Sequence, residues 1–319
     1  MKIVILTEAG EGIGLGHYMR TKMVYQEFLN NGIESKYYLA KAGDLYRFDH
    51  VILLDWLSKI TSIKDELIDA IVIVDSYLVK IEVLNYINLI CKELIIYDDY
   101  QRIQYPKNAA ILNVNIYGDE INYEQIRVAS GKKYTCVRPK FREERNKYSI
   151  REKLEKVLIT LGGSDYRNRL PIIIDICDSL GLDIRVVAGN DSLKLKLCEK
   201  FPEMNIFGFI NEDDMKNLMN SSDLAISAGG QTLHELSILG IPTIGICIDN
   251  DQEKNLSFYT RTGFIKKSIM WNDPLFSKKL ENAIEHMGPK ETRLKCSNIG
   301  QKLVDGKGQE NIFKWILNL

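Results

Sequence analysis

The chain has 319 residues, of which 45% are hydrophobic and 27% are charged, and these values exclude a disordered or fibrous protein. This length is more than one compact core normally holds, so we expect two domains. The formal net charge is −1, whereas proteins that coat nucleic acids usually carry a clear basic excess. We therefore expect no nucleic-acid partner.

The six cysteines are scattered, without a C-x-x-C pair or a histidine at ligand spacing, so we expect free thiols in a reducing cytoplasm. The apolar residues after Met1 soon reach Glu8, and no later run approaches the roughly 20 apolar residues of a membrane span. We expect a cytoplasmic monomer with no transmembrane segment, no metal and no cofactor.

Short runs rich in Ile and Val alternate with longer amphipathic segments, a pattern typical of parallel sheets covered by helices. The strands predicted in the first half are 2–7, 35–39, 51–54, 71–74, 94–97 and 111–114. Those predicted in the second half are 156–161, 184–188, 205–207, 224–227 and 243–248. The predicted helices are 18–30, 168–180, 192–200, 213–221, 233–239 and 253–262.

The segment 138–155 begins with a crowd of charged residues, and we interpret it as a solvated linker. A new strand opens at Lys156, so the predicted domains are residues 1–145 and 146–319. The last residues, 311–319, predict a helix whose apolar face needs a docking surface. We consider the N-terminal domain as that surface.

The first strand leads into glycines at positions 10, 12, 14 and 16, directly before His17. This spacing does not match G-x-G-x-x-G, because the sixth position from Gly10 is Leu15, and no Gly-Lys-Ser/Thr of a P-loop is present. The loop predicts a backbone turn that lets a ligand approach closely at the carboxyl edge of a sheet.

An isolated histidine most often caps or packs a helix, but His17 opens a helix at this ligand-binding edge. Histidine titrates near pH ~6.5, and a helix N-terminus favours the neutral ring, which suits a general base.

The second domain repeats the pattern of a strand followed by glycines. The run 157–161 leads into Gly162–Asp165, and the run 224–227 leads into Gly229 and Gly230, followed by a helix that contains Glu235. Glycines before a helix present backbone N–H groups to an anion, which can hold a diphosphate without a metal. Each turn alone could be a tight loop. Together with a carboxylate able to bind ribose hydroxyls, they predict a nucleotide site.

Several motifs occur together in the order of a known family: Gly14-Leu15-Gly16-His17-Tyr18-Met19-Arg20, Val74-Asp75-Ser76-Tyr77, Tyr97-Asp98-Asp99-Tyr100, Leu112-Asn113-Val114-Asn115, Leu161-Gly162-Gly163-Ser164-Asp165 and Gly229-Gly230-Gln231-Thr232 to Glu235. Over nearly its whole length the sequence resembles the UDP-2,4-diacetamido-2,4,6-trideoxy-β-L-altropyranose hydrolases of pseudaminic acid biosynthesis and the related spore-coat polysaccharide proteins. The resemblance implies an α/β fold of the GT-B type, with two Rossmann-like domains whose parallel sheets face across a cleft.

The resemblance also implies roles for individual residues. His17 would activate water at the anomeric carbon, Tyr77 would line the sugar site, and uracil would lie against Phe209 and Ile210. The predicted catalytic positions are His17, Tyr77 and Asp98. The predicted substrate-binding positions are Gly14, Gly16, Arg20, Gly163, Ser164, Asp165, Phe209, Ile210, Ser227, Gly229, Gly230, Gln231, Thr232, Glu235 and Gln252.

Some of these residues have an equally ordinary interpretation. The pair Asp98-Asp99 could orient His17, bind sugar hydroxyls or form a surface turn, and it lacks the D-x-D signature of a metal site. Arg20 could contact phosphate or a carboxylate, although a solvated helix charge is the more common outcome.

The predicted function is hydrolysis of a UDP-activated diacetamido-trideoxy sugar with inversion, with water as the acceptor. The spacing from Gly229 to Glu235 also fits sugar transferases of the same fold, so transfer from a UDP-sugar to an acceptor stays open. A third possibility is a non-catalytic protein that binds a nucleotide sugar.

Overall fold

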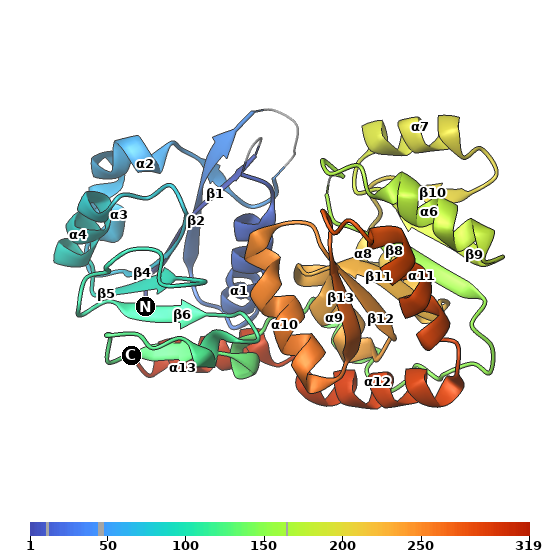
Figure 1. Ribbon diagram of the computed structural model, residues 1–319. Helices are drawn as coiled ribbons and strands as arrows, with labels where there is room; N and C mark the ends of the chain where they lie inside the picture. The colour runs from blue at the N-terminus through green and yellow to red at the C-terminus, as the bar shows by residue number, and fades with distance from the viewer. Residues whose placement is uncertain (11–12, 44–47, 164) are drawn as a thin grey trace. The chain divides into compact units, whose positions relative to one another are not determined.

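The computed structural model describes residues 1–10, 13–43, 48–163 and 165–319. The chain divides into two compact units (Figure 1). Unit 1 consists of Met1–Cys136 and Lys307–Leu319, and unit 2 consists of Val137–Gly306. Each unit contains one sheet, so the two-domain α/β fold expected from the sequence is confirmed.

Both sheets are parallel throughout and share one topology. The strands of unit 1 are β1 (Ile3–Gly10), β2 (Ser35–Ala42), β3 (Ile52–Leu53), β4 (Ile71–Asp75), β5 (Glu93–Tyr97), β6 (Ala110–Asn113) and β7 (Val128–Ser130), in the order β3-β2-β1-β4-β5-β6-β7. The strands of unit 2 are β8 (Lys156–Thr160), β9 (Asp183–Val187), β10 (Asn205–Phe207), β11 (Leu224–Ala228), β12 (Thr243–Cys247) and β13 (Ile265–Met270), in the order β10-β9-β8-β11-β12-β13. This is the doubly wound order, in which ligands bind where the strand order reverses.

The helices of unit 1 are α1 (Gly16–Asn30), α2 (Trp56–Lys59), α3 (Lys64–Leu67), α4 (Ile81–Ile90) and α13 (Gly308–Leu317), with 3-10 turns η1 (Ile60–Ile63), η2 (Gly118–Glu120) and η3 (Lys132–Tyr134). Those of unit 2 are α5 (Pro139–Glu143), α6 (Leu170–Ser179), α7 (Asp191–Lys200), α8 (Glu212–Asn220), α9 (Gln231–Leu239), α10 (Glu253–Thr262), α11 (Phe276–His286) and α12 (Lys290–Leu303), with the 3-10 turn η4 (Asn250–Gln252).

Unit 1 has a core on each face of its sheet, because successive side chains of a strand point to opposite faces. Ile3 and Ile5 of β1 pack on the face that carries α1, and Val4 and Leu6 pack on the other. Helix α13 completes the first of these cores by burying Ile312 and Ile316. The last helix of the chain therefore belongs to unit 1.

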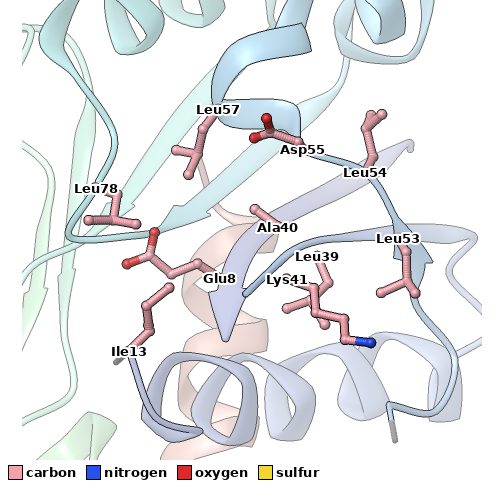
Figure 2. A pocket seen from close by; sticks show the side chains of 10 residues that line it. All are labelled: Glu8, Ile13, Leu39, Ala40, Lys41, Leu53, Leu54, Asp55, Leu57 and Leu78. Carbon is pink, nitrogen blue, oxygen red and sulfur yellow. The ribbon is translucent and has the colours of Figure 1, made fainter. Parts of the chain in front are cut away.

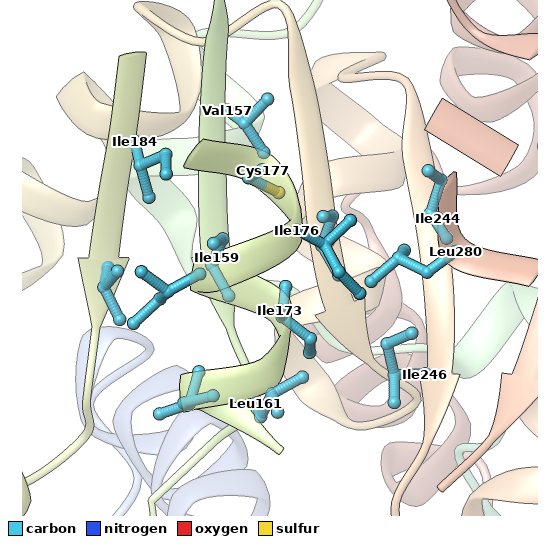
Figure 3. Close-up of a cluster of buried hydrophobic side chains, with 14 of the residues drawn as sticks. Val157, Ile159, Leu161, Ile173, Ile176, Cys177, Ile184, Ile244, Ile246 and Leu280 are labelled. Carbon is cyan, nitrogen blue, oxygen red and sulfur yellow. The ribbon is translucent and has the colours of Figure 1, made fainter. Parts of the chain in front are cut away.

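In unit 2, β8 and α6 build the centre of the apolar core. Figure 3 shows Val157 and Ile159 of β8, Leu161 directly after it, and Ile173 and Ile176 of α6. These side chains belong to one apolar cluster. Proline near the start of α6 is compatible with its first turn, where the missing N–H has no helical partner.

The segment after residue 137 is not a solvated linker. Phe141 of α5 is fully buried, and Arg138 forms an ion pair with the buried Glu235. Aromatic and ion-pair contacts thus hold this charged stretch against unit 2, and the units divide at 136/137, compared with the expected 145/146.

Candidate active site

The site residues of unit 1 gather at the carboxyl ends of its central strands. Strand order reverses between β1, which pairs with β2, and β4, which continues toward β5 and β6. Glu8 lies near the end of β1, Asp75 ends β4, and Asp99 follows β5 by two residues. Because the strands are parallel, these ends meet at one edge of the sheet, where ligands of open α/β sheets bind.

The loop between β1 and α1 is closed by its own backbone. The N–H of Gly10 donates to the carbonyl of Gly14 at 3.0 Å, and the N–H of Gly14 donates back at 2.8 Å. Gly14 has φ +80°, a left-handed backbone conformation that residues other than glycine rarely adopt. Helix α1 then begins at Gly16, two residues earlier than predicted, which places His17 in its first turn.

His17 is held by a carboxylate on one side of its ring. Its Nδ1 lies 2.6 Å from Oδ1 of Asp75, and the residue is only 7% exposed. Burial alone would raise the pKa of Asp75, but the charges of Arg20 and His17 and their hydrogen bonds lower it to about 2. An ionised carboxylate can only accept, so Nδ1 donates to Asp75, and in the neutral tautomer that this bond selects Nε2 keeps a lone pair.

Arg20 joins two carboxylates below this histidine. It lies one turn after His17 and hence on the same helix face. Its guanidinium donates to Asp75 at 2.6 and 2.7 Å and to Asp99 at 2.8 and 2.9 Å. Burial opposes the charge of Arg20, yet the two carboxylates raise its pKa well above the ordinary value. Of the two interpretations left open for Arg20, the structure has the contact with carboxylates and not the solvated charge, because β4 and β5 bring Asp75 and Asp99 to this face of α1.

Tyr77 borders the same network. Its hydroxyl donates to Asp99, its ring meets that of His17 edge-on with centroids 4.4 Å apart, and the residue is 38% exposed. Asn115 also donates to Asp99, at 2.5 Å. Asp99 thus accepts hydrogen bonds from an arginine, a tyrosine hydroxyl and an asparagine amide. Its pKa is pulled upward by burial but is lowered on balance by Arg20.

Asp98, which was predicted as catalytic, has a different role. Its carboxylate accepts the backbone N–H groups of Gln101 and Arg102 and the hydroxyls of Tyr105 and Tyr123. These four bonds fix the loop after β5, and Asp75 takes the orienting role that had been considered for Asp98. Sequence reasoning missed Asp75 even though it ends a strand whose residues are all buried.

Sequence reasoning also missed Glu8. This glutamate is 1% exposed, its Oε1 lies 3.8 Å from Nε2 of His17, and it accepts hydrogen bonds from Ser76 Oγ and the Tyr77 N–H. It lines a cavity of about 460 Å³ (Figure 2) whose other walls are mostly aliphatic: Ile13, Leu39, Ala40, Lys41, Leu53, Leu54, Asp55, Leu57 and Leu78. The signal available in the sequence was a charged residue directly after the predicted strand 2–7 and before the glycine loop.

In unit 2, the glycine turn before α9 has one face against protein and one face open. A side chain at Gly229 would meet Leu256 and Gln252, whereas none of the described atoms lies within 4 Å of a Cβ built at Gly230. Oε1 of Gln252 accepts the N–H of Gly229 at 3.1 Å and that of Ile248 at 3.4 Å. Gln252 therefore braces the turn from inside, and the open face lies at Gly230.

Glu235 lies one turn into α9 and is 1% exposed. Both of its carboxylate oxygens accept from Arg138, at 2.6 and 2.7 Å, in a fork-like pair. Burial raises the pKa of Glu235, and the guanidinium of Arg138 partly offsets this. Glu235, the residue predicted to bind ribose, is thus already paired with Arg138 in this structure.

The other predicted positions of unit 2 lie around the two turns. Asp165 accepts the N–H groups of Arg169 and Leu170 where α6 begins, and a Cβ built at Gly163 meets no described atom within 4 Å. Phe209 is 77% exposed. The remaining positions are Ser227, which is buried, and Ile210, Gln231 and Thr232, which are partly buried. Ser164 lies outside the described residues.

Among the described residues, no group of three or more His, Cys, Asp or Glu side chains is arranged to hold a metal ion. In the same part of the chain, no helix combines the length and apolarity that crossing a membrane requires.

Part of the second unit matches a family model. Residues 179–307 match the glycosyltransferase family 28 C-terminal domain. The chain is 25% identical over 281 residues to the UDP-2,4-diacetamido-2,4,6-trideoxy-β-L-altropyranose hydrolase of Campylobacter jejuni subsp. jejuni, which covers 83% of this chain and 98% of that protein.

A Helicobacter pylori protein named as a pseudaminic acid cytidylyltransferase and UDP-2,4-diacetamido-2,4,6-trideoxy-β-L-altropyranose hydrolase is 25% identical over 279 residues, covering 85% of this chain and 49% of its own. The chain thus spans about half the length of some curated relatives that it matches, 55% and 49% in two cases.

The fold was compared with solved structures as well. The crystal structure of Acinetobacter baumannii MurG aligns over 100% of both chains with a TM-score of 0.68 and 14% identity. The chain therefore has the GT-B fold, carries a glycosyltransferase family 28 C-terminal domain over residues 179–307, and is a distant homologue of the UDP-diacetamido-sugar hydrolases.

Proposed function

We propose that this protein hydrolyses the anomeric C–O bond of a UDP-activated diacetamido-trideoxy sugar and releases UDP and the free sugar with inversion. In this reaction a water oxygen bonds to the anomeric carbon as the bond to the diphosphate oxygen breaks. The electron pair of that bond leaves with UDP, and the proton from water goes to a base. The proposal draws its substrate from the named hydrolases that the chain resembles over most of its length.

The observation that carries the proposal is the pairing of His17 with Asp75. The 2.6 Å contact fixes the ring and its tautomer, so that Nε2 is the atom available to accept a proton. As the ring becomes positive, the ionised Asp75 stabilises it. One base on one face of the sugar is what a single inverting displacement requires.

The glycine turns of unit 2 would hold the leaving group. The helix N-terminus at Gly230 supplies N–H groups and a partial positive charge that stabilise a diphosphate without a metal. Phe209 would stack on uracil. A ribose contact to Glu235 would share a carboxylate that Arg138 already binds.

Glycosyl transfer is the second candidate, because the match over residues 179–307 is to a glycosyltransferase domain. The same base would then deprotonate an acceptor hydroxyl instead of water.

The test is to incubate purified protein with UDP-2,4-diacetamido-2,4,6-trideoxy-β-L-altropyranose, without acceptor and without metal, and to follow UDP release. We expect release, and we expect His17→Ala to reduce it by about 10³-fold because the base is lost. His286→Ala is the matched control, since His286 lies exposed at the end of α11. Release that occurs only when an acceptor is supplied would favour transfer. Equal release by wild type and His17→Ala would remove His17 from the mechanism.

A further inference from the structure

Glu8 is an unusual residue for its position. All eight residues of β1 are buried, and the strand lies in the middle of the unit 1 sheet between β2 and β4. A carboxylate costs several kcal/mol to bury unless it is well hydrogen-bonded or paired. A glutamate at 1% exposure beside a candidate base is therefore a group whose chemistry needs an explanation.

The Glu8 carboxylate is fixed from the neighbouring strand. Ser76 and Tyr77 follow β4 directly, and they donate to its two oxygens through Oγ and the backbone N–H, the latter at 2.8 Å. Each carboxylate oxygen can accept two hydrogen bonds. Oε1 therefore keeps capacity for another donor, and its place is set by backbone rather than by a flexible side chain.

The spacing between Glu8 and His17 suits a third atom. Oε1 and Nε2 are 3.8 Å apart, too long for a direct N–H···O bond. A water oxygen about 2.8 Å from each, the usual length for such bonds, fits between them. We infer that Glu8 and His17 together hold the water that attacks the anomeric carbon. The inference rests on the proposed function, to which it adds a second group acting on the nucleophile.

A cavity lies next to Glu8. Figure 2 shows the Glu8 side chain among the residues that line it, with Ile13 and Leu78 nearby. His17 is not among the lining residues, so this cavity lies beside the position inferred for the water, and its mostly aliphatic walls surround the Glu8 side chain with few polar groups. A low-dielectric surrounding also strengthens the attraction between Glu8 and a protonated His17.

The step balances with these two groups. One water O–H gives its proton to Nε2 of His17 while the other stays hydrogen-bonded to Oε1 of Glu8. The water oxygen forms its bond to the anomeric carbon, and the bond to the diphosphate oxygen breaks with its electron pair leaving on UDP. The imidazolium then lies between Asp75 and Glu8 until it returns its proton to solvent.

The test compares Glu8→Gln with the control Glu93→Gln, which neutralises another buried glutamate of unit 1, at the opposite, amino end of β5. UDP release is measured with and without added methanol, and free sugar and methyl glycoside are separated. Methanol has a single O–H group, and His17 must accept its proton. In the wild type the methyl group would then face Glu8, to which it cannot donate a hydrogen bond. For Glu8→Gln we expect kcat to fall at least about tenfold with KM little changed, and the ratio of methyl glycoside to free sugar to rise at least about threefold.

The inference is overturned if Glu8→Gln keeps the kcat of Glu93→Gln, or if it loses kcat with an unchanged product ratio. Should Glu8→Gln not fold, Ser76→Ala removes one anchor of the carboxylate, and both parameters should move in the same directions by smaller factors. Unchanged values in that variant would overturn the inference too. A wild-type protein that releases no UDP contradicts the proposed function itself, and the inference falls with it.

Discussion

Two buried histidines of this protein lie in similar places and have different surroundings. His17 follows the glycine turn after β1 at the start of α1, and His234 follows the glycine turn after β11 near the start of α9. They are 7% and 5% exposed. His17 has Asp75 at 2.6 Å from one ring nitrogen and Glu8 at 3.8 Å from the other, whereas His234 has the hydroxyl of Tyr259 at 2.8 Å.

This comparison shows that burial does not make a histidine a base. Burial alone lowers the pKa of His234 to about 4, so this ring stays neutral at physiological pH and cannot usefully hold a proton taken from a substrate. At His17 two carboxylates face the ring, and they stabilise the charge it would acquire. The partners, rather than the position after a glycine turn, separate a packing histidine from a candidate catalytic one.

The sharpest way to break the comparison is Asp75→Asn. The amide can donate to Nδ1 and so favour the tautomer with the proton on Nε2, which removes the base. We expect UDP release to fall by about 10³-fold, because the histidine is then held in the wrong tautomer. Because the pKa of Asp75 is about 2, its carboxylate stays ionised in the wild type throughout the range of roughly pH 5 to 8 in which activity would be measured.

Asp223→Asn is the matched control for that variant, since Asp223 is a buried aspartate bound by Arg151 in unit 2. Activity of Asp75→Asn within threefold of this control would mean that Asp75 does not set the state of His17.

A second prediction concerns stability and pH at His234. Its folded pKa of about 4 lies below the ~6.5 of an unfolded histidine, so between these values the unfolded chain binds more protons. The stability that the neutral ring contributes is complete above pH ~6.5 and is lost as the pH falls toward 4, about 3 kcal/mol in total. Thermal unfolding of wild type and His234→Gln from pH 7 to 4 measures it. The advantage of the wild type should shrink with falling pH, and a constant difference would contradict the assignment.

The smallest expected effects come from the tyrosines beside the two histidines, Tyr77 at His17 and Tyr259 at His234. Tyr77→Phe keeps the ring against His17 but removes a donor to Asp99, and we expect activity to fall by up to tenfold, which is about 1.4 kcal/mol. Tyr259→Phe removes the hydrogen bond to His234, which should cost about 1 kcal/mol of unfolding free energy and leave kcat unchanged. Kinetics and urea unfolding of both variants test this. A loss of activity in Tyr259→Phe with unchanged activity in Tyr77→Phe would contradict the roles assigned to the two histidines.

Much of the fold could be predicted because central parallel strands are buried on both faces and read as continuous apolar runs. The strands that the sequence did not predict, β7 and β13, lie at sheet edges, and β13 carries Lys266 and Lys267 on its exposed positions. Edge strands need less apolar surface, so their pattern is weaker. The sequence also did not predict the helices α4, α11 and α12 or the short helices α2, α3 and α5.

The site could be predicted only in part. The glycine turns and His17 are local signals, but the partnership of Arg20 with Asp75 and Asp99 depends on which strands end beside α1. One clue was present: Ile71, Ile73 and Asp75 alternate along β4 and so share the face that carries α1. The two-residue alternation along β4 together with the three-residue spacing of His17 and Arg20 on α1 would have predicted that both side chains meet Asp75.

Helix α13 has a consequence for how the protein is made. Unit 1 is built from both ends of the sequence, and its core includes Ile312 and Ile316. During synthesis the first 136 residues leave the ribosome long before these side chains exist, whereas unit 2 is complete at residue 306. The unit that is translated first therefore finishes folding last, and its candidate site stays on an incomplete core until helix α13 has been made.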